Sequence, residues 1–383
     1  MGEKIRRIAI VRLTDNLESD DRIRKEIHSI RKLFPNILFK IFVVFSSNEE
    51  KEGTTLYGVD YKSYRLKSRE KYSSGGNLFA KTWDFYRTIK EDIAGYDALW
   101  VSGDAPMPML LFENRMPLIW DLREFPEYMV GNSVRRFILR VIFKRCRVLL
   151  HGNQERLDCL MSKGVVKDTS KHIPIKNYPD FSEEDTNEDE RYLDVKKWIG
   201  NRKCVYLQGL DSDKRAPIET LSVIMKRDDL CAIVLGRFMN SCIENFRNKY
   251  GSVWDDKILL VGSVPILQIP KYMRLCEMSM IFYKHISTNN YLCEPNRLYQ
   301  AINVGLPVVV GNNPTMANVV LEYDCGVVCD TDGADIGEIE NGLNKLSLNY
   351  GKYIKNIENW NGKLIWSNQD GIFHKVIELL FRD

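Results

Sequence analysis

The sequence contains no apolar run that approaches the roughly 18–20 residues needed to span a bilayer. It contains no CxxC pair, and its nine cysteines are scattered, the nearest two being Cys325 and Cys329. Such cysteines are expected to be reduced, mostly buried thiols of a cytoplasmic protein. The opening segment MGEKIRRIAIVRL has a basic start but only a short apolar stretch and no small-residue cleavage site. We therefore expect no secretory signal peptide.

Common catalytic signatures are also missing. The five histidines are dispersed without metal-ligand spacing, so no resident metal or cofactor is expected. The patterns HExxH, GxSxG and Walker A are absent, which leaves little support for zinc hydrolase, serine hydrolase or P-loop chemistry. No nucleic-acid-binding module is visible, and a net charge of +3 is too near neutral to favour a nucleic-acid partner.

The chain has 383 residues, which at about 100–200 residues per domain predicts two domains. Charge is divided unevenly, because residues 1–180 hold 32 Lys and Arg against 24 Asp and Glu, whereas the remainder holds 23 against 28. The first part is therefore +8 and the second −5. The division agrees with two domains that meet different partners, although scatter alone would also produce it.

Short β-rich runs alternate with helical patterns in both halves of the chain. The first half predicts a helix over 20–33 and strands at 8–11, 38–44, 98–101, 118–120 and 148–150. An acidic stretch at 181–190 interrupts the pattern. The second half predicts a helix over 217–225 and strands at 205–208, 232–235, 258–261, 278–283 and 308–310. This alternation predicts two parallel α/β sheets, with ligands bound beyond the carboxyl ends of the strands, in a cleft.

Two strand-end loops in the second half have the composition of binding loops. In the first, Gly209 ends a strand, and Lys214 and Arg215 stand beside the start of a helix, where an anion is stabilised. In the second, Gly262 ends an apolar strand and Val264 lies in the tight loop that follows. Each loop by itself is equally typical of an ordinary turn.

A third loop is denser in polar side chains. Pro295 suits the first turn of a helix and would place Asn296 and Arg297 at its N-terminus, where an anion is stabilised. Gln300 lies one turn later on the same side and could reach a ribose hydroxyl. Residues 305–307, Gly-Leu-Pro, predict the end of this helix before the next strand.

The three loops together resemble the nucleotide-sugar site of GT-B glycosyltransferases close to glycosyltransferase family 4. Residues 295–300 (PNRLYQ) and 304–308 (VGLPV) are similar to that family's PN(K/R)LxE and AxGxPV motifs. The loop with Gly209 and Arg215 resembles its GG…RG phosphate loop, and residues 262–265 resemble its GxVP loop. The resemblance implies that a UDP- or GDP-linked sugar donor binds to Gly209, Lys214, Arg215, Gly262, Val264, Tyr283, Glu294, Asn296, Arg297 and Gln300.

The chain departs from the family pattern at one pair of positions. Family 4 often carries two glutamates separated by seven residues, and the corresponding residues here are Leu292 and Gln300. Glu294 lies two residues from the first of these positions, and Gln300 keeps hydrogen-bonding capacity without the charge. The resemblance implies a metal-independent hexosyltransferase of the retaining type, and these departures leave the stereochemical outcome open.

The resemblance extends over the first half, so that it covers residues 8–330. Residues 17–27 are similar to the family's SDxRVxxEA helix, 118–129 to its YDxHEyfPE segment and 175–181 to its xxRNxPD segment. The loop in 96–110 carries Asp104. The resemblance implies that the first domain binds the acceptor through Asp21, Arg22 and Asp104.

The domain boundaries that follow from this resemblance describe a GT-B fold. We predict an N-terminal Rossmann-like domain over 1–182, an acidic linker over 183–198 and a C-terminal Rossmann-like domain over 199–369. A last helix within 370–383 is predicted to return to the first domain. The two parallel-sheet domains would face a cleft.

Arg123 occupies the position at which the family usually has a histidine that contacts the transferred sugar. Arginine is always charged and cannot be a general base, but it could stabilise a leaving diphosphate or bind an anionic sugar. Asp121 and Glu124 flank it, and either could act as a base or orient an acceptor hydroxyl. These three residues are the predicted catalytic group. The alternative is an Asp–Arg–Glu ion-pair cluster that pins the loop.

Residues 133–147 include six basic residues and no acidic one. A basic amphipathic helix of this kind can lie on an anionic bilayer, so we predict peripheral contact with the inner face of the cytoplasmic membrane between Arg135 and Arg147. An ordinary helix with one solvated face is the alternative.

Taken together, the residues and the resemblance predict a cytoplasmic glycosyltransferase. It would move a sugar from a nucleoside diphosphate donor to a glycan or lipid-linked glycan in surface polysaccharide assembly. Two alternatives stay open: a nucleotide-sugar epimerase on the same fold, and a catalytically degenerate scaffold protein that binds a nucleotide-sugar.

Overall fold

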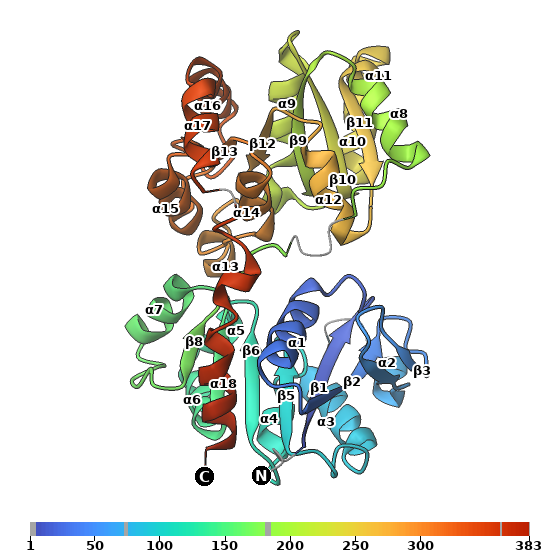
Figure 1. Cartoon of the computed structure of the whole chain (residues 1–383), viewed down its shortest axis with the longest axis vertical. Helices are drawn as coiled ribbons and strands as arrows, with labels where there is room; N and C mark the ends of the chain where they lie inside the picture. Colours follow the sequence, from blue (N-terminus) through green and yellow to red (C-terminus); the bar gives the residue numbers. More distant parts are fainter. Residues whose placement is uncertain (1–4, 73–75, 181–184, 361, 383) are drawn as a thin grey trace. The chain divides into compact units, whose positions relative to one another are not determined.

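The computed structural model describes residues 5–72, 76–180, 185–360 and 362–382. The chain forms two compact units, unit 1 (Met1–Lys176 with Gln369–Asp383) and unit 2 (Asn177–Asn368). Each unit is a predominantly parallel β-sheet covered by helices (Figure 1). The predicted α/β fold with two parallel-sheet domains is therefore confirmed.

The sheet of unit 1 has eight strands in the order β3-β4-β2-β1-β5-β6-β7-β8, and only the β3–β4 pair is antiparallel. The central strands are apolar on both faces, as in β1, where Ile8, Ala9, Ile10 and Val11 are all buried. The strand bounds are β1 (Arg6–Thr14), β2 (Ile37–Phe45), β3 (Glu52–Thr54), β4 (Asp60–Ser63), β5 (Ala98–Ser102), β6 (Leu118–Leu122), β7 (Val148–His151) and β8 (His172–Pro174).

Helices cover the faces of this sheet. The apolar side chains Ile23, Ile27 and Ile30 recur along the first helix and are buried, and the Asp20 side chain caps its N-terminus. The helices of unit 1 are α1 (Asp21–Leu33), α2 (Lys67–Lys71), α3 (Leu78–Ile89), α4 (Met109–Phe112), α5 (Glu127–Val130), α6 (Ser133–Arg145), α7 (Gln154–Ser162) and α18 (Ile372–Phe381).

The last helix, α18, belongs to unit 1 although it lies at the end of the chain. Polar contacts before α18 fix its entry: Asp370 accepts a 2.6 Å hydrogen bond from Ser29 Oγ and pairs with Lys32 at 2.8 Å. Gln369 exchanges two hydrogen bonds with the backbone of Lys176. The predicted return of the C-terminal helix is confirmed.

The sheet of unit 2 has six parallel strands in the order β11-β10-β9-β12-β13-β14. Buried apolar residues form a core on each face of it. The strand bounds are β9 (Lys203–Leu210), β10 (Leu230–Phe238), β11 (Ile258–Gly262), β12 (Met278–Ile281), β13 (Val308–Val310) and β14 (Gly326–Val328). The α-helices are α8 (Glu190–Ile199), α9 (Pro217–Lys226), α10 (Asn240–Tyr250), α11 (Ser252–Lys257), α12 (Ile269–Met273), α13 (Thr288–Tyr291), α14 (Asn296–Asn303), α15 (Pro314–Tyr323), α16 (Ile336–Leu348) and α17 (Tyr350–Glu358). The 3-10 turns are η1 (Asp213–Arg215), η2 (Ile266–Gln268) and η3 (Trp366–Gln369), the last at the border of the unit.

The segment predicted as an acidic linker, residues 183–198, differs from that description. Most of it is helix α8, whose Tyr192, Val195 and Ile199 are buried in the core of unit 2. The high acid content hid this apolar stripe, which recurs at helical spacing. Residues 181–184 lie outside the described residues, and the two units divide at 176/177 and 368/369.

Candidate functional site

Unit 2 contains a hollow of about 230 Å³ at the carboxyl ends of its central strands. Strand β9 supplies Gln208 and Gly209, β10 supplies Gly236, and Tyr283 follows β12. The helix α14 supplies its first residues. The full lining is Gln208, Gly209, Arg215, Gly236, Ile266, Ile269, Tyr283, Pro295, Asn296, Arg297 and Gln300.

Two arginines converge on this hollow. Arg297 donates a hydrogen bond to the carbonyl of Gln208, and its guanidinium lies 5.0 Å from the centre of the Tyr283 ring. Arg215 donates to the carbonyl of Gly209 at 2.7 Å and lies 5.7 Å from the same ring. Among the described residues, the buried Nε of Arg297 has no hydrogen-bond partner. The two guanidiniums, both close to one aromatic ring, concentrate positive charge on one side of the hollow, an arrangement that suits an anionic group.

Two glycines with left-handed backbone conformations line the same side of the hollow. Gly209 and Gly236 both have positive φ, +62° and +80°. A Cβ at Gly209 would lie 2.2 Å from Nη1 of Arg215, and a Cβ at Gly236 would lie 3.6 Å from the backbone nitrogen of Gly209. Gly209 therefore leaves room for Arg215, whereas a Cβ at Gly236 would make only an ordinary van der Waals contact and its positive φ is what favours glycine.

The N-terminus of α14 completes the polar end of the hollow. Pro295 directly precedes this helix, so that Asn296 and Arg297 form its first turn. The Oδ1 atom of Asn296 is buried and has no hydrogen-bond partner among the described residues. Gln300 follows one turn later and is buried. Free backbone amides and the helix dipole favour an anion here.

Six of the ten residues predicted to bind the donor line this hollow: Gly209, Arg215, Tyr283, Asn296, Arg297 and Gln300. Four do not. Lys214 is exposed on η1, and Glu294 accepts a hydrogen bond from Tyr299. Gly262 ends β11 and Val264 lies in the loop that follows, and neither lines the hollow. The lining residue that the sequence analysis missed most plainly is Gly236, which directly follows a predicted strand, as Gly209 does. The roles of the ten predicted residues in binding a donor stay predictions.

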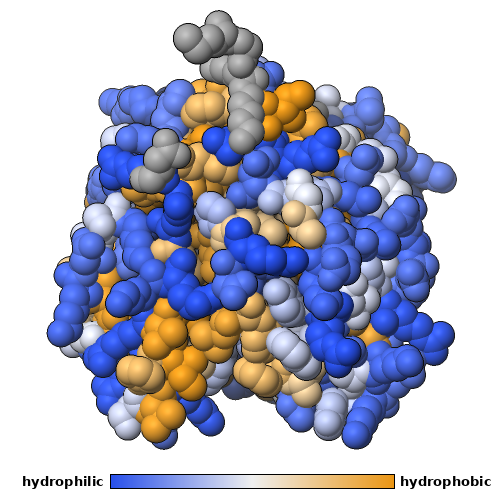
Figure 2. Space-filling model, turned by 90° about the horizontal axis from the view of Figure 1, so that it is seen from below, coloured by the Kyte–Doolittle hydropathy of each residue, from blue (hydrophilic) through white to orange (hydrophobic). Residues whose placement is uncertain are grey.

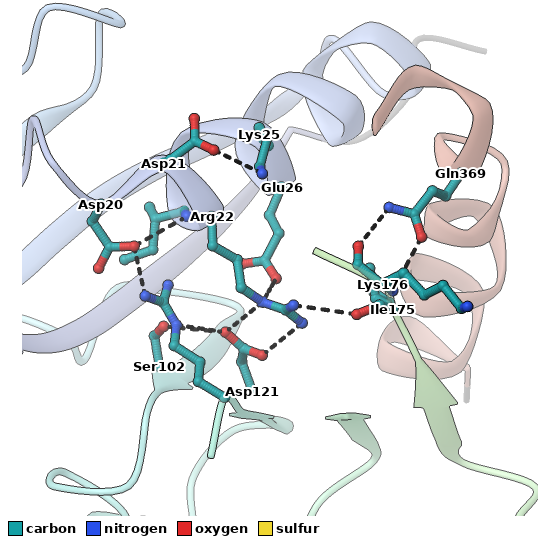
Figure 3. Close-up of polar contacts among 12 residues, drawn as sticks. Asp20, Asp21, Arg22, Lys25, Glu26, Ser102, Asp121, Ile175, Lys176 and Gln369 are labelled. Carbon is teal, nitrogen blue, oxygen red and sulfur yellow. Dashed lines mark hydrogen bonds and ion pairs between the residues drawn. The ribbon is translucent and has the colours of Figure 1, made fainter. Parts of the chain in front are cut away.

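Unit 1 carries a buried cluster of charged side chains at the carboxyl edge of its sheet (Figure 3). Asp121 is fully buried on β6, and its two oxygens pair with Arg22 Nη2 at 3.0 Å and with Arg123 Nε at 2.9 Å. Arg123 Nη1 also pairs with Asp20 at 2.6 Å, and Arg22 Nε with Glu26 at 3.0 Å. Figure 3 shows Arg22 of α1 joined to Asp121 of the sheet, with Glu26 joined to Arg22 on the same helix.

The environment of this cluster shifts the pKa values of its members. Burial, reinforced by the charge of Asp121, raises the pKa of Glu26 to about 8. Burial opposes the charge of Arg123, but Asp20 and Asp121 outweigh it and raise the pKa of that guanidinium. Arg123 therefore stays charged and its donors are directed into the protein. This geometry matches the alternative given above, in which Arg123 belongs to an ion-pair cluster. Its acidic partners are Asp121 and Asp20, whereas Glu124 was expected in the place of Asp20.

The remaining residues predicted in unit 1 fall in different places. Glu124 is largely exposed and lies 3.6 Å from Arg156. Asp21 pairs with Arg24 at 2.9 Å and Lys25 at 2.7 Å, so it faces its own helix. Asp104 follows β5, next to Gly103, whose backbone N–H donates to the carbonyl of Asp121.

Asp104, at the carboxyl edge of the unit 1 sheet, has a buried carboxylate oxygen and a raised pKa. Its Oδ1 is buried and meets no hydrogen-bond donor among the described residues. Burial, together with the charge of Glu124, raises the pKa of Asp104 to about 7. A carboxyl group that is half protonated near neutral pH can accept a hydrogen bond from a hydroxyl group or donate one to it. Within the described residues, no group of three histidine, cysteine or acidic side chains is placed to hold a metal ion.

Two successive parallel-sheet units, with the C-terminal helix in the first, give this chain the GT-B fold. Sucrose-phosphate synthase from Thermosynechococcus elongatus matches it with a TM-score of 0.75 at 11% identity, over 98% of this chain and 99% of the other. HepE from Anabaena, in complex with UDP, matches with a TM-score of 0.69 at 14% identity, over 97% and 99%. The trehalose-6-phosphate structure from E. coli bound with UDP-2-fluoro glucose matches with a TM-score of 0.71 at 9% identity, over 98% and 99%. No family model matches the chain, and no curated protein matches its sequence. Identities this low show the fold alone.

Proposed function

We propose that the chain is a glycosyltransferase that binds a nucleoside diphosphate sugar, of the UDP or GDP type, in unit 2. The hollow carries this proposal, because Arg215, Arg297 and the N-terminus of α14 surround one space. The half-buried Ile266 and the buried Ile269 line the same hollow and offer an apolar surface to a base. The similarity of fold to HepE, which was solved in complex with UDP, supports a donor of this class.

In this proposal the two arginines take up the charge that develops on the departing diphosphate. Guanidinium groups held in place by Gln208, Gly209 and Tyr283 need no reorganisation when that charge appears. Gln300 would hydrogen-bond a ribose hydroxyl. The chemistry needs no metal ion, and the resemblance to glycosyltransferase family 4 favours a retaining transfer.

We further propose that unit 1 binds the acceptor, a glycan or lipid-linked glycan of surface polysaccharide assembly on the cytoplasmic side of a membrane. Asp104 supplies an unused acceptor atom for a hydroxyl, and the exposed Glu124 stands close enough to affect it electrostatically. Asp121 and Arg123 act by positioning, because Asp121 pairs with Arg22 and Arg123, and Arg123 Nη1 also pairs with Asp20. Of the guanidinium atoms of Arg123, the buried Nη2 has no hydrogen-bond partner among the described residues. The ion pairs disfavour Arg123 as the ligand of an anionic sugar.

Calorimetry with UDP, GDP, CDP, ADP and dTDP tests the donor site. We expect one of the five to bind, and Arg297→Ala to weaken it about ten- to hundredfold, since a hydrogen-bonded charge contributes about 1.5–3 kcal/mol. Lys226→Ala is the matched control, because Lys226 is an exposed cation of the same unit that does not line the hollow. Absence of binding, or equal losses in the two variants, would contradict the donor site. Binding without transfer to any acceptor would favour a scaffold, and product formed without an acceptor would favour an epimerase.

Gly209→Ala tests the construction of the hollow. The new Cβ would fall 2.2 Å from Nη1 of Arg215, so this guanidinium must leave the carbonyl of Gly209. We expect the affinity for the bound diphosphate to fall about tenfold, with about 1–2 kcal/mol of backbone strain in addition. Gly305→Ala is the control, because Gly305 also has a positive φ but an added Cβ would meet open space. This variant should lose stability without losing affinity for the diphosphate. Equal affinity in both variants would show that Arg215 does not bind the ligand.

A further inference from the structure

Unit 1 exposes an aromatic surface that the proposed donor and acceptor sites do not use. On α3, Phe79 is 57% exposed and Trp83, one turn later, is 43% exposed. Both rings pack edge-on against Phe112 of α4, with ring centres 5.1 and 4.8 Å apart. Large apolar groups gathered on a soluble surface mark an interaction site.

Helix α6 packs against α4 and carries further exposed apolar side chains. Val134, Ile138, Val141 and Arg145 recur along one side of α6, and Arg145 fixes that side toward α4 by donating to the carbonyl of Leu110 at 2.8 Å. Val134 is 65% exposed and Phe137 beside it is 64% exposed. Figure 2 shows apolar side chains gathered in the lower part of the face of unit 1 that is seen from below. We call Phe79, Trp83, Phe112, Val134 and Phe137 the aromatic surface.

The charges of α6 beside the aromatic surface are positive, whereas Asp84 and Glu113 directly follow Trp83 and Phe112 in the chain. Residues 133–145, which form α6, include five basic residues and no acidic one, and Arg87 is exposed one turn after Trp83 on α3. Several of these cations are held in place, because Arg140 donates to the carbonyl of Gly164 and Arg135 to that of Tyr128. These arginines keep their charge, but their side chains are held against the protein by these hydrogen bonds. The cations of α6 are therefore less available for membrane contact than the sequence analysis assumed. The exposed apolar side chains contribute more to the proposed contact.

The aromatic surface adjoins the edge of the sheet that carries Asp104. The Thr82 side chain of α3 donates a hydrogen bond to the carbonyl of Ala105, the residue after Asp104. Helix α4 begins at Met109, directly after this loop. A partner on the aromatic surface would thus lie beside the proposed acceptor site.

We propose that the aromatic surface lies on an anionic lipid bilayer, with Trp83 and Phe137 inserted at the headgroup boundary. Aromatic side chains bordered by cations suit this interface, whereas a second copy of the chain would place the cations of α6 against one another. The contact is peripheral, since no helix among the described residues is long and apolar enough to cross a bilayer. Membrane binding stands independently of the proposed function, but the delivery of a lipid-linked acceptor to Asp104 rests on it.

Co-sedimentation of the full chain with vesicles tests this inference. We expect binding to vesicles of phosphatidylcholine and phosphatidylglycerol, weak binding to pure phosphatidylcholine, and loss with salt. The double variant Trp83→Ser with Phe137→Ser should bind the anionic vesicles at least about tenfold more weakly. Leu56→Ser is the matched control, because Leu56 is a 91% exposed apolar residue of the same unit outside the aromatic surface.

Each other result contradicts the inference. Failure of the unaltered chain to bind anionic vesicles, or an equal loss in Leu56→Ser, would overturn it. A concentration-dependent dimer that the double variant abolishes would identify a second copy as the occupant. Circular dichroism establishes that the variants fold. Diphosphate binding, measured on the same samples, reports on the proposed function separately, because its residues lie in unit 2.

Discussion

Replacing Asp121 with asparagine is expected to lower the free energy of unfolding of unit 1 by about 3–5 kcal/mol. The substitution keeps the shape of the side chain and removes its charge. Arg22 and Arg123, which pair with it at 3.0 and 2.9 Å, are themselves buried or nearly so and cannot regain water without disrupting the edge of the sheet. The large cost arises because two buried cations lose their shared partner while Asp20 and Glu26 neutralise them only in part.

Urea unfolding followed by circular dichroism measures this loss, and hydrogen exchange of the peptides from α1 and β6 assigns it to unit 1. Glu70→Gln is the matched control, since Glu70 pairs with Arg65 at 2.7 Å in the same unit but on the surface. An exposed pair contributes about 0–1 kcal/mol, so this control should change little. If Asp121→Asn were as stable as the control, the buried cluster would not hold the edge of the sheet together.

Asp104→Asn is expected to raise the free energy of unfolding, and to do so mainly at higher pH. The pKa of Asp104 is raised to about 7 from 3.8, chiefly by burial. Between these two values the folded chain holds a proton that the unfolded chain releases, so the free energy of unfolding falls as the pH rises through this window. Asparagine resembles the protonated acid at every pH. The variant should therefore gain about 3 kcal/mol of stability at pH 8 and almost nothing near pH 4.

Urea unfolding at pH 5 and at pH 8 measures the difference. Asp158→Asn is the control, because Asp158 is an exposed acid of unit 1 that accepts a hydrogen bond from Gln154. We expect its effect to be small at both pH values. A gain that is the same at pH 5 and pH 8 would show that Asp104 does not carry an elevated pKa. If Asp104 binds the acceptor, the more stable variant should also transfer sugar more slowly while its diphosphate binding is unchanged.

The central strands of both sheets could be predicted from the sequence, whereas the short strands β3, β4, β8 and β14 were missed. Strands such as 8–11 and 232–235 are short, β-rich and apolar throughout, which is a local property of buried parallel strands. Gly209, Arg215, Asn296 and Arg297 could be predicted for the same reason, since each lies at the end of a strand or the start of a helix. Because the carboxyl ends of parallel strands share one edge, their approach to a common hollow followed from the topology.

The tertiary structure alone decided which side chains became partners. Arg22 and Asp121 are separated by 99 residues, and nothing in the spacing of either segment distinguishes a pair from two solvated charges. His151 and His172 looked dispersed in the sequence, yet their ring nitrogens lie 2.8 Å apart. The aromatic surface formed in the same way, since Phe112 meets Phe79 and Trp83 only where α4 packs on α3. Hydrophobic patterning and turn residues act over a few positions, so they determined the elements, whereas pairing across the sheet depends on long-range packing that no local pattern records.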